Sequence, residues 1–232
     1  MARHGKRYNA AAKQVDAKRQ YRIGEAVELL KALPKTKFDE TLELAFKLGV
    51  DPKQSDQMVR GTVALPHGSG KKVRVVVFAK GASAQAAKDA GADIVGFEDL
   101  VKKCQEGWTD FDVAVATPEA MQEVRKLGKV LGPKGLMPNP KTGTVTEDTA
   151  KAVKEVKAGR VEFKMDKAAN LHISFGKLSF AGEAIQENAK AVITAVVHAK
   201  PATAKGQFIE SCTLSSTMGP GIKIDHHEFS TS

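Results

Sequence analysis

Residues 73–79 read Val-Arg-Val-Val-Val-Phe-Ala, a nearly continuous apolar segment that indicates a strand buried on both faces. An alanine-rich helix is expected at 83–90. Beyond it we expect a short strand at 94–95, a helix at 97–106, a buried strand at 111–116, and helices at 118–127 and 147–157. Strands without polar alternation that take turns with helices are typical of a parallel sheet covered on both faces. The middle of the chain is therefore predicted to form a small three-layer, Rossmann-like α/β unit.

The segments on either side of this unit have a different pattern. Residues 41–50 alternate strictly between apolar and other residues, as in a half-buried strand; a helix is expected before them at 23–33 and a strand after them at 59–65. Beyond Gly159, strands at 161–165 and 171–175 are expected to form a hairpin that turns at 166–170. A helix at 183–198 and a strand at 207–214 complete the pattern.

The two outer blocks are predicted to fold together. Neither block alone supplies enough strands and helices to close a core. The fold class is therefore α/β, with a discontinuous two-layer domain at 1–67 and 160–232 and an inserted parallel-sheet α/β domain at 68–159. Glycine-containing segments at 66–70 and 158–159 join the two domains.

Positive charge is concentrated at the N-terminus. The formal net charge is +9, and residues 1–22 hold seven cations against one acid, a net of +6. A basic arm on a nearly neutral body suggests a polyanionic partner, with a merely solubilising tail as the alternative.

Several classes of protein are not expected from the sequence. No apolar run approaches the roughly 20 residues of a membrane helix, and no apolar segment of a secretory signal follows the basic N-terminus. Cys104 and Cys212 have no ligand spacing and are expected to be reduced core residues of a cytoplasmic protein. The adjacent pair His226-His227 would point its side chains apart, so neither a metal nor a cofactor is expected.

The segment 131–145 reads Leu-Gly-Pro-Lys-Gly-Leu-Met-Pro-Asn-Pro-Lys-Thr-Gly-Thr-Val. Its three prolines and three glycines prevent a regular helix or central strand, so a shaped loop is expected. Lys134 and Lys141 lie in it without any acid, which suits phosphate contact; a proline-rich connector with solvated lysines is the alternative. Gly135 and Lys141-Thr142 have the spacing of a P-loop, but Pro140 stands where that motif needs a glycine amide.

Two other function classes are weaker alternatives. A nucleotide-using α/β enzyme would have its site in the inserted unit, but Lys80-Gly81-Ala82-Ser83 lacks the Gly-x-Gly-x-x-Gly fingerprint, and no His–acid or paired-carboxylate motif accompanies it. No enzymatic activity and no catalytic residue are therefore predicted. A nonspecific binder that acts through its basic arm is the other alternative.

Separated motifs carry a resemblance that none of them would establish alone. They are the loop 131–145, Phe38-Asp39-Glu40-Thr41, Gly91-Ala92-Asp93, Gly107-Trp108, Phe111-Asp112, Ala116-Thr117-Pro118, Lys157-Ala158-Gly159-Arg160 and Thr217-Met218-Gly219-Pro220. In their order along the chain they resemble the large-subunit ribosomal protein L-one family, the protein of the tRNA-exit stalk. The resemblance covers essentially residues 1–232.

The resemblance implies a monomeric structural protein of the large ribosomal subunit, without a membrane partner. Such a protein binds rRNA at the base of the mobile exit-site stalk, assists release of deacylated exit-site tRNA, and represses translation of its own operon by binding its mRNA. The implied rRNA- and mRNA-binding residues lie on the discontinuous domain: Lys37, Phe38, Thr41, Glu43, Asp166, Lys167, Ser211, Thr217, Met218 and Gly219. The loop of the inserted domain would add a secondary RNA or tRNA contact through Lys134, Gly135 and Lys141.

The chemistry of these residue types suits structured RNA, which is read through shape, 2′-hydroxyls and phosphates. Ser211, Thr213 and Ser215 alternate on one face of the last long strand, and Thr217 continues the row if the extended geometry persists. An ordinary exposed strand face is the alternative. Phe38 could pack on a sugar or base, or could instead be a core residue at a strand edge.

Overall fold

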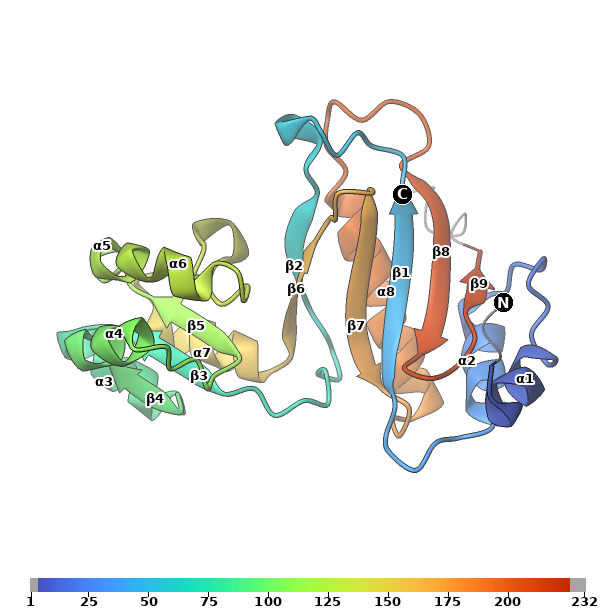
Figure 1. Cartoon of the computed structure of the whole chain (residues 1–232), viewed down its shortest axis with the longest axis horizontal. Coiled ribbons are helices and arrows are strands. Elements are labelled where there is room, and N and C mark those ends of the chain that lie inside the picture. Colours follow the sequence, from blue (N-terminus) through green and yellow to red (C-terminus); the bar gives the residue numbers. More distant parts are fainter. Residues whose placement is uncertain (1–3, 226–232) are drawn as a thin grey trace. The chain divides into compact units, whose positions relative to one another are not determined.

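The computed structural model describes residues 4–225, apart from the side chains of Ser55 and Lys141 (Figure 1). The chain forms two compact units, Met1–Gly70 with Val161–Ser232, and Lys71–Arg160. The predicted fold class is confirmed: one unit holds antiparallel sheets from both ends of the chain, and the other holds a parallel three-stranded sheet. The pair His226-His227 lies outside the described residues.

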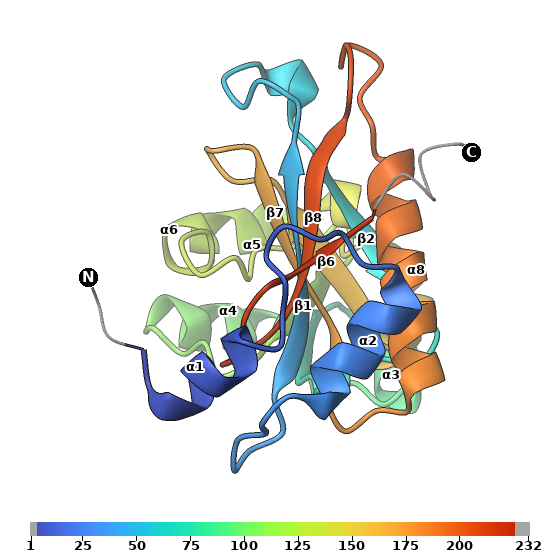
Figure 2. The same ribbon diagram turned by 90° about the vertical axis from the view of Figure 1, so that its right-hand side faces the viewer.

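The main sheet of the discontinuous unit has the strand order β7-β1-β8-β9. Its strands are β7 (Asn170–Lys177), β1 (Thr41–Leu48), β8 (Ile209–Ser216) and β9 (Ile222–Ile224), all antiparallel to their neighbours. Two helices, α2 (Ile23–Ala32) and α8 (Gly182–His198), lie side by side on one face of this sheet, to its right in Figure 2. A two-stranded sheet of β2 (Arg60–Ala64) and β6 (Arg160–Lys164) adds to the same core.

Alternation along β1 produces a sheet with one buried and one open face. Leu42, Leu44, Phe46 and Leu48 are each at most 1% exposed and pack with the buried stripes of α2 and α8. No helix in the described part of this unit covers the opposite face of β7, β1 and β8, which is turned toward the viewer in Figure 1. The polar side chains of these strands are therefore available to a partner.

The predicted hairpin of residues 161–165 and 171–175 is wrong. β6 pairs with β2, and β7 pairs with β1, so the turn between them connects two different sheets. The turn is closed by the Asp166 amide, which donates to the Asn170 carbonyl at 2.9 Å, but no ladder continues from it. Two apolar segments joined by five residues have the local pattern of a hairpin, whereas their strand partners are set by contacts distant in sequence.

The inserted unit has a parallel sheet in the order β4-β3-β5, formed by β3 (Val75–Phe78), β4 (Ile94–Gly96) and β5 (Val113–Ala116). One face packs against α3 (Gly81–Asp89) and α7 (Thr149–Lys157). The other face packs against α4 (Glu98–Gln105) and a helical run of α5 (Met121–Val124), η2 (Arg125–Leu127) and α6 (Gly128–Leu131). The helix predicted at 118–127 is thus present, but it begins at Met121 and its helical run extends to Leu131.

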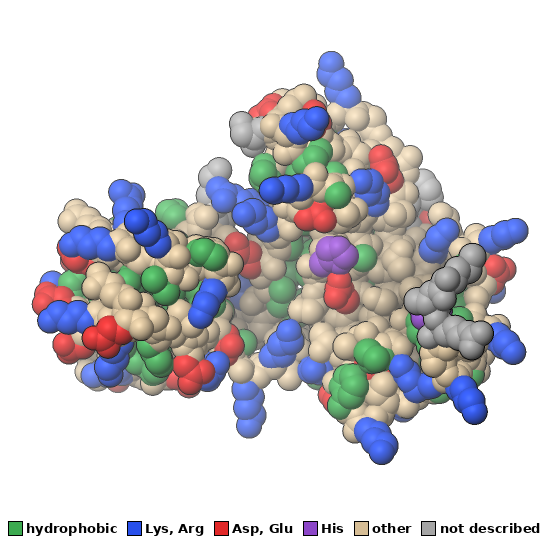
Figure 3. All heavy atoms as spheres, in the orientation of Figure 1, with side chains coloured by type: hydrophobic (Ala, Val, Ile, Leu, Met, Phe, Trp, Pro, Cys, Tyr) green, Lys and Arg blue, Asp and Glu red, His purple; other side chains and the backbone are tan. Residues whose placement is uncertain are grey.

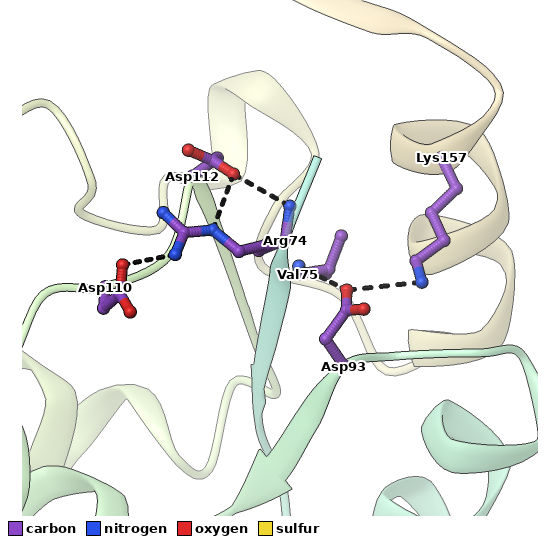
Figure 4. A network of polar contacts seen from close by, with 6 residues as sticks. All are labelled: Arg74, Val75, Asp93, Asp110, Asp112 and Lys157. Carbon is purple, nitrogen blue, oxygen red and sulfur yellow. Dashed lines mark hydrogen bonds and ion pairs between the residues drawn. The ribbon is translucent and has the colours of Figure 1, made fainter. Parts of the chain in front are cut away.

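Carboxylates hold the amino-terminal ends of the parallel strands in register (Figure 4). Asp93, just before β4, accepts the Val75 amide at 2.8 Å, and Asp112, just before β5, accepts the Arg74 amide at 2.9 Å. These amide bonds are the main reason that the pKa of each carboxyl lies below its ordinary value. Lys157 also approaches Asp93 at 3.3 Å. Asp93 and Asp112 thus join the ends of neighbouring strands, and the same bonds favour their ionised forms.

None of the helices in residues 4–225 combines the length and the apolar character that a membrane crossing needs.

Three short helices among the described residues were not anticipated: α1 (Lys6–Ala12) in the basic arm, η1 (Ser55–Gln57), and η3 (Pro140–Thr142) in the loop 131–145.

Candidate nucleic-acid interface

The open face of the main sheet carries three parallel rows of side chains. Lys47, Ala45 and Glu43 of β1 are paired with Ser211, Thr213 and Ser215 of β8. On the other side, the same β1 residues are paired with Asn170, His172 and Ser174 of β7. The predicted alternation of hydroxyl side chains along β8 is therefore present, with Cys212 and Leu214 turned into the core. The rows form a polar strip about 20 Å long between the levels of Thr41 and Lys47.

Two large hydrophobic side chains are displayed at the end where β1 begins and β8 ends. Phe38 is 53% exposed and Met218 is 52% exposed. Phe38 is thus not a core residue. Figure 3 shows hydrophobic side chains with Lys and Arg side chains beside them on this end of the unit. Exposed apolar groups among cations suit the faces of bases and sugars together with their phosphates.

A buried carboxylate organises this end of the sheet. Glu40 is 2% exposed and accepts hydrogen bonds from the Ser216 hydroxyl at 2.7 Å, the Met218 amide at 3.1 Å and the Thr36 amide at 3.3 Å. Burial alone would raise the pKa of the Glu40 carboxyl, but these bonds outweigh it and hold the pKa below its ordinary value. Glu40 therefore ties the segment before β1 to the segment after β8.

Thr217 does not continue the hydroxyl row, because β8 ends at Ser216. Its hydroxyl accepts from the Thr41 amide at 3.0 Å and donates to the Thr41 carbonyl at 3.2 Å. Gly219 is also constrained from within, since a Cβ there would lie 2.4 Å from the Ser216 hydroxyl oxygen. Both residues therefore shape the segment that displays Met218, in addition to any contact with RNA.

The other end of the strip is built around the turn after β6. Asp166 accepts the Ala168 and Asn170 amides, each at 2.8 Å, and these bonds hold its pKa below the ordinary value. Lys47 donates to the Ala168 carbonyl at 2.6 Å. Lys167 is exposed on the same turn. Asp166 thus holds the turn in shape, and Lys167 is the member of the predicted pair with a free reach to phosphate.

The residues predicted for RNA binding therefore fall into two groups joined by the strip. One end of the strip holds Lys37, Phe38, Thr41, Thr217, Met218 and Gly219. The other end holds Asp166, Lys167 and Ser211. Glu43 lies between them, where it contacts the ring of His172 at 2.6 Å.

The basic arm is folded against the discontinuous unit within the described residues. Ala11 of α1 is 1% exposed, and the Tyr21 amide donates to the Lys223 carbonyl at 2.9 Å beside β9. Arg19 is paired with Glu25 at 2.7 Å, whereas Lys6 and Lys18 are exposed. A free arm draped along phosphates is therefore not what residues 4–22 form.

The loop 131–145 of the inserted unit is shaped by its own threonines. Thr142 is 2% exposed and donates its hydroxyl to the Asn139 carbonyl at 3.1 Å. The amides of Thr142 and Thr144 donate to the same carbonyl, each at 3.2 Å. A P-loop would need these amides for phosphate and the hydroxyl for Mg²⁺. The loop 131–145 therefore does not have the arrangement of a nucleotide-binding P-loop.

The predicted contact residues of this loop lie on its surface where they are described. Lys134 is exposed and donates to the Thr109 hydroxyl, and Gly135 is exposed with a φ of 71°. The backbone of Lys141 lies in η3 (Pro140–Thr142), and nothing is described of its side chain. Within the described residues no three His, Cys, Asp or Glu side chains converge as metal ligands.

Comparison with known proteins identifies the family. A model of the ribosomal protein L1p/L10e family matches residues 30–220. The chain belongs to this family. Its relatives include the large ribosomal subunit protein uL1 of two strains of Lactobacillus delbrueckii subsp. bulgaricus, each 55% identical over 225 residues, which are 97% of this chain and 97% of the relative. The resemblance noted from the separated motifs is thereby confirmed, and the chain is a ribosomal protein.

Sequence reasoning missed two residues that organise the interface. Glu40 lies two positions before Leu42, so the alternation of β1 places it on the core side, where a carboxylate needs several donors. That signal was available. Arg7, by contrast, contacts segments far away in the sequence, and no local pattern distinguishes it from the other cations of the arm.

Proposed function

We propose that the discontinuous unit binds large-subunit rRNA at the base of the exit-site stalk through the open face of its main sheet. The observation that carries this proposal is the simultaneous exposure of Phe38 and Met218 at one end of a strip of hydroxyl side chains. Exposed apolar side chains rimmed by polar groups mark interaction surfaces when they form a patch. Short hydroxyl groups suit 2′-hydroxyls and phosphates, and the apolar pair suits splayed bases.

Replacing Phe38 with alanine tests the proposal directly. Phe38→Ala is expected to weaken binding of a stalk rRNA fragment by about 1–3 kcal/mol, the range found for a base stacked on an aromatic side chain. Met218→Ala is expected to act in the same direction. Affinity would be measured by titration at fixed salt against an unrelated structured RNA of equal length.

Met58→Ala is the matched control, because Met58 is 40% exposed and follows the opposite end of β1. The proposal requires that Met58→Ala cost clearly less affinity than Phe38→Ala or Met218→Ala. If all three substitutions have equal effects, the apolar pair is not the recognition surface.

We further propose that the loop 131–145 provides a secondary contact with the phosphates of RNA or of exit-site tRNA, and so assists tRNA release. Lys134→Met is expected to lower the magnitude of the slope of log K against log salt for tRNA by about 1, because one phosphate contact is lost. Lys88→Met is the control, since Lys88 is exposed on α3, on the other face of the parallel sheet. Equal slopes for the two variants would contradict the assignment of Lys134.

The same surface is proposed to bind a similar fold in the mRNA of the protein's own operon and thereby to repress translation on cytoplasmic ribosomes. A single surface predicts competition: the stalk rRNA fragment should displace the mRNA fragment completely, and Phe38→Ala should weaken both. Simultaneous binding of the two RNAs would show that separate surfaces are used.

A further inference from the structure

We propose that Arg7 is a positioning residue of the RNA-binding surface: it holds the two segments that display Phe38 and Met218 in one arrangement before RNA arrives. The inference rests on the proposed rRNA binding of the discontinuous unit. It assigns to the basic arm a role inside the protein, where charge alone had suggested direct contact with phosphate.

The guanidinium of Arg7 bridges two segments that are distant in sequence. Its Nη1 donates to the Pro34 carbonyl at 3.1 Å, and its Nη2 donates to the Met218 carbonyl at 2.7 Å. Pro34 lies just after α2, at the start of the segment that leads to Phe38, and Met218 lies just after β8. The side chain is half-buried, in keeping with two internal partners.

Arg7 and Glu40 bind the backbone of the same two segments, through different peptide groups. The Met218 amide donates to the buried Glu40 carboxylate, and the Met218 carbonyl accepts from Arg7, so both backbone polar groups of Met218 are occupied. In the other segment the Thr36 amide donates to Glu40, and the Pro34 carbonyl accepts from Arg7. Each of the two segments that display Phe38 and Met218 is therefore held by both side chains.

Such an arrangement improves binding by removing an ordering cost. A segment that is already fixed in its bound conformation loses less conformational entropy when RNA binds. Arginine suits this task because its planar guanidinium presents several N–H groups in a rigid fork, whereas a lysine ammonium is a point charge on a flexible stem.

The arm supplies a matched control. Lys6 precedes Arg7 in α1, and its exposed side chain makes no hydrogen bond or ion pair with other described residues. Lys6→Met therefore removes one positive charge from the same helix and leaves the two bridged segments untouched.

The test compares Arg7→Met, Arg7→Lys and Lys6→Met with the wild-type chain. Binding of a stalk rRNA fragment would be titrated at several salt concentrations, and amide hydrogen exchange at 217–219 would be followed in the free protein. We expect Kd to rise about tenfold in both Arg7 variants. The slope of log K against log salt should stay that of the wild type, and amide exchange at 217–219 should be faster. Lys6→Met should keep wild-type exchange.

Two results would overturn the proposal. Arg7→Lys could bind as the wild type does while Arg7→Met loses about one unit of salt slope, which would make Arg7 a phosphate contact. Unchanged exchange at 217–219 in both Arg7 variants would show that Arg7 does not fix the segment. If the wild-type chain has no preference for stalk rRNA, the proposed function fails, and the exchange comparison alone still decides what Arg7 does.

Discussion

Phe46→Ala is expected to lower the free energy of unfolding of the discontinuous unit by about 3–5 kcal/mol. Phe46 is 1% exposed in the central strand β1, and truncating it leaves a cavity that the flanking strands cannot fill. Because domains are stable by only about 5–15 kcal/mol, this substitution should remove a large share of the stability of the unit. Urea unfolding followed by far-UV circular dichroism would measure the change.

Phe78→Ala is the matched substitution in the inserted unit, where Phe78 is fully buried. The same loss of stability is expected there, but stalk rRNA affinity should stay within about threefold of wild type if recognition resides in the other unit. Trp108 is the only tryptophan and packs in the Phe78 cluster, so its fluorescence reports unfolding of this unit. A large loss of rRNA affinity in Phe78→Ala would contradict the division of roles between the units.

Glu40→Ala is expected to cost about 3 kcal/mol of stability and to weaken rRNA binding more than that loss explains. The substitution leaves the Ser216 hydroxyl and the Met218 and Thr36 amides without their acceptor in a buried site. Glu40→Gln keeps one acceptor oxygen and should lose about half as much. Glu43→Gln is the control for stability only, because Glu43 lies on the open face of the same strand. Equal losses of stability in Glu40→Gln and Glu43→Gln would contradict a special role of the buried carboxylate.

The pH dependence of Glu40 has a defined sign. Its pKa is lower in the folded protein than its ordinary value, so the folded state favours the charged carboxylate. Its contribution to stability is therefore present above the ordinary pKa and is lost as the pH falls through the lowered one. The stability difference between wild type and Glu40→Gln should shrink between about pH 7 and about pH 3. A difference that stays constant over this range would contradict the lowered pKa.

Local pattern was sufficient for most elements of the fold. The unalternated run 73–79 and the alternating run 41–50 each reflect which faces of a strand are buried, and a single segment carries that information. The hairpin prediction for 161–175 failed because partner choice between strands depends on the whole core. The displayed residues of the interface were inferred through family resemblance, and physical periodicity supported only the hydroxyl row of β8.

The amino-acid order therefore established the class of fold, because burial of one or both strand faces leaves a mark within a short segment, and its separated motifs together carried the family resemblance. Only the tertiary structure decided that Phe38 and Met218 are displayed on one surface. Folding decided which polar groups of that surface are already occupied. Thr217 is bonded to Thr41, Glu40 to Met218, and Arg7 to Met218 and Pro34, across separations of up to 211 residues. Hydrogen bonds depend on the distance and direction between two groups in space. The pattern of residues along the sequence contains neither quantity for residues so far apart.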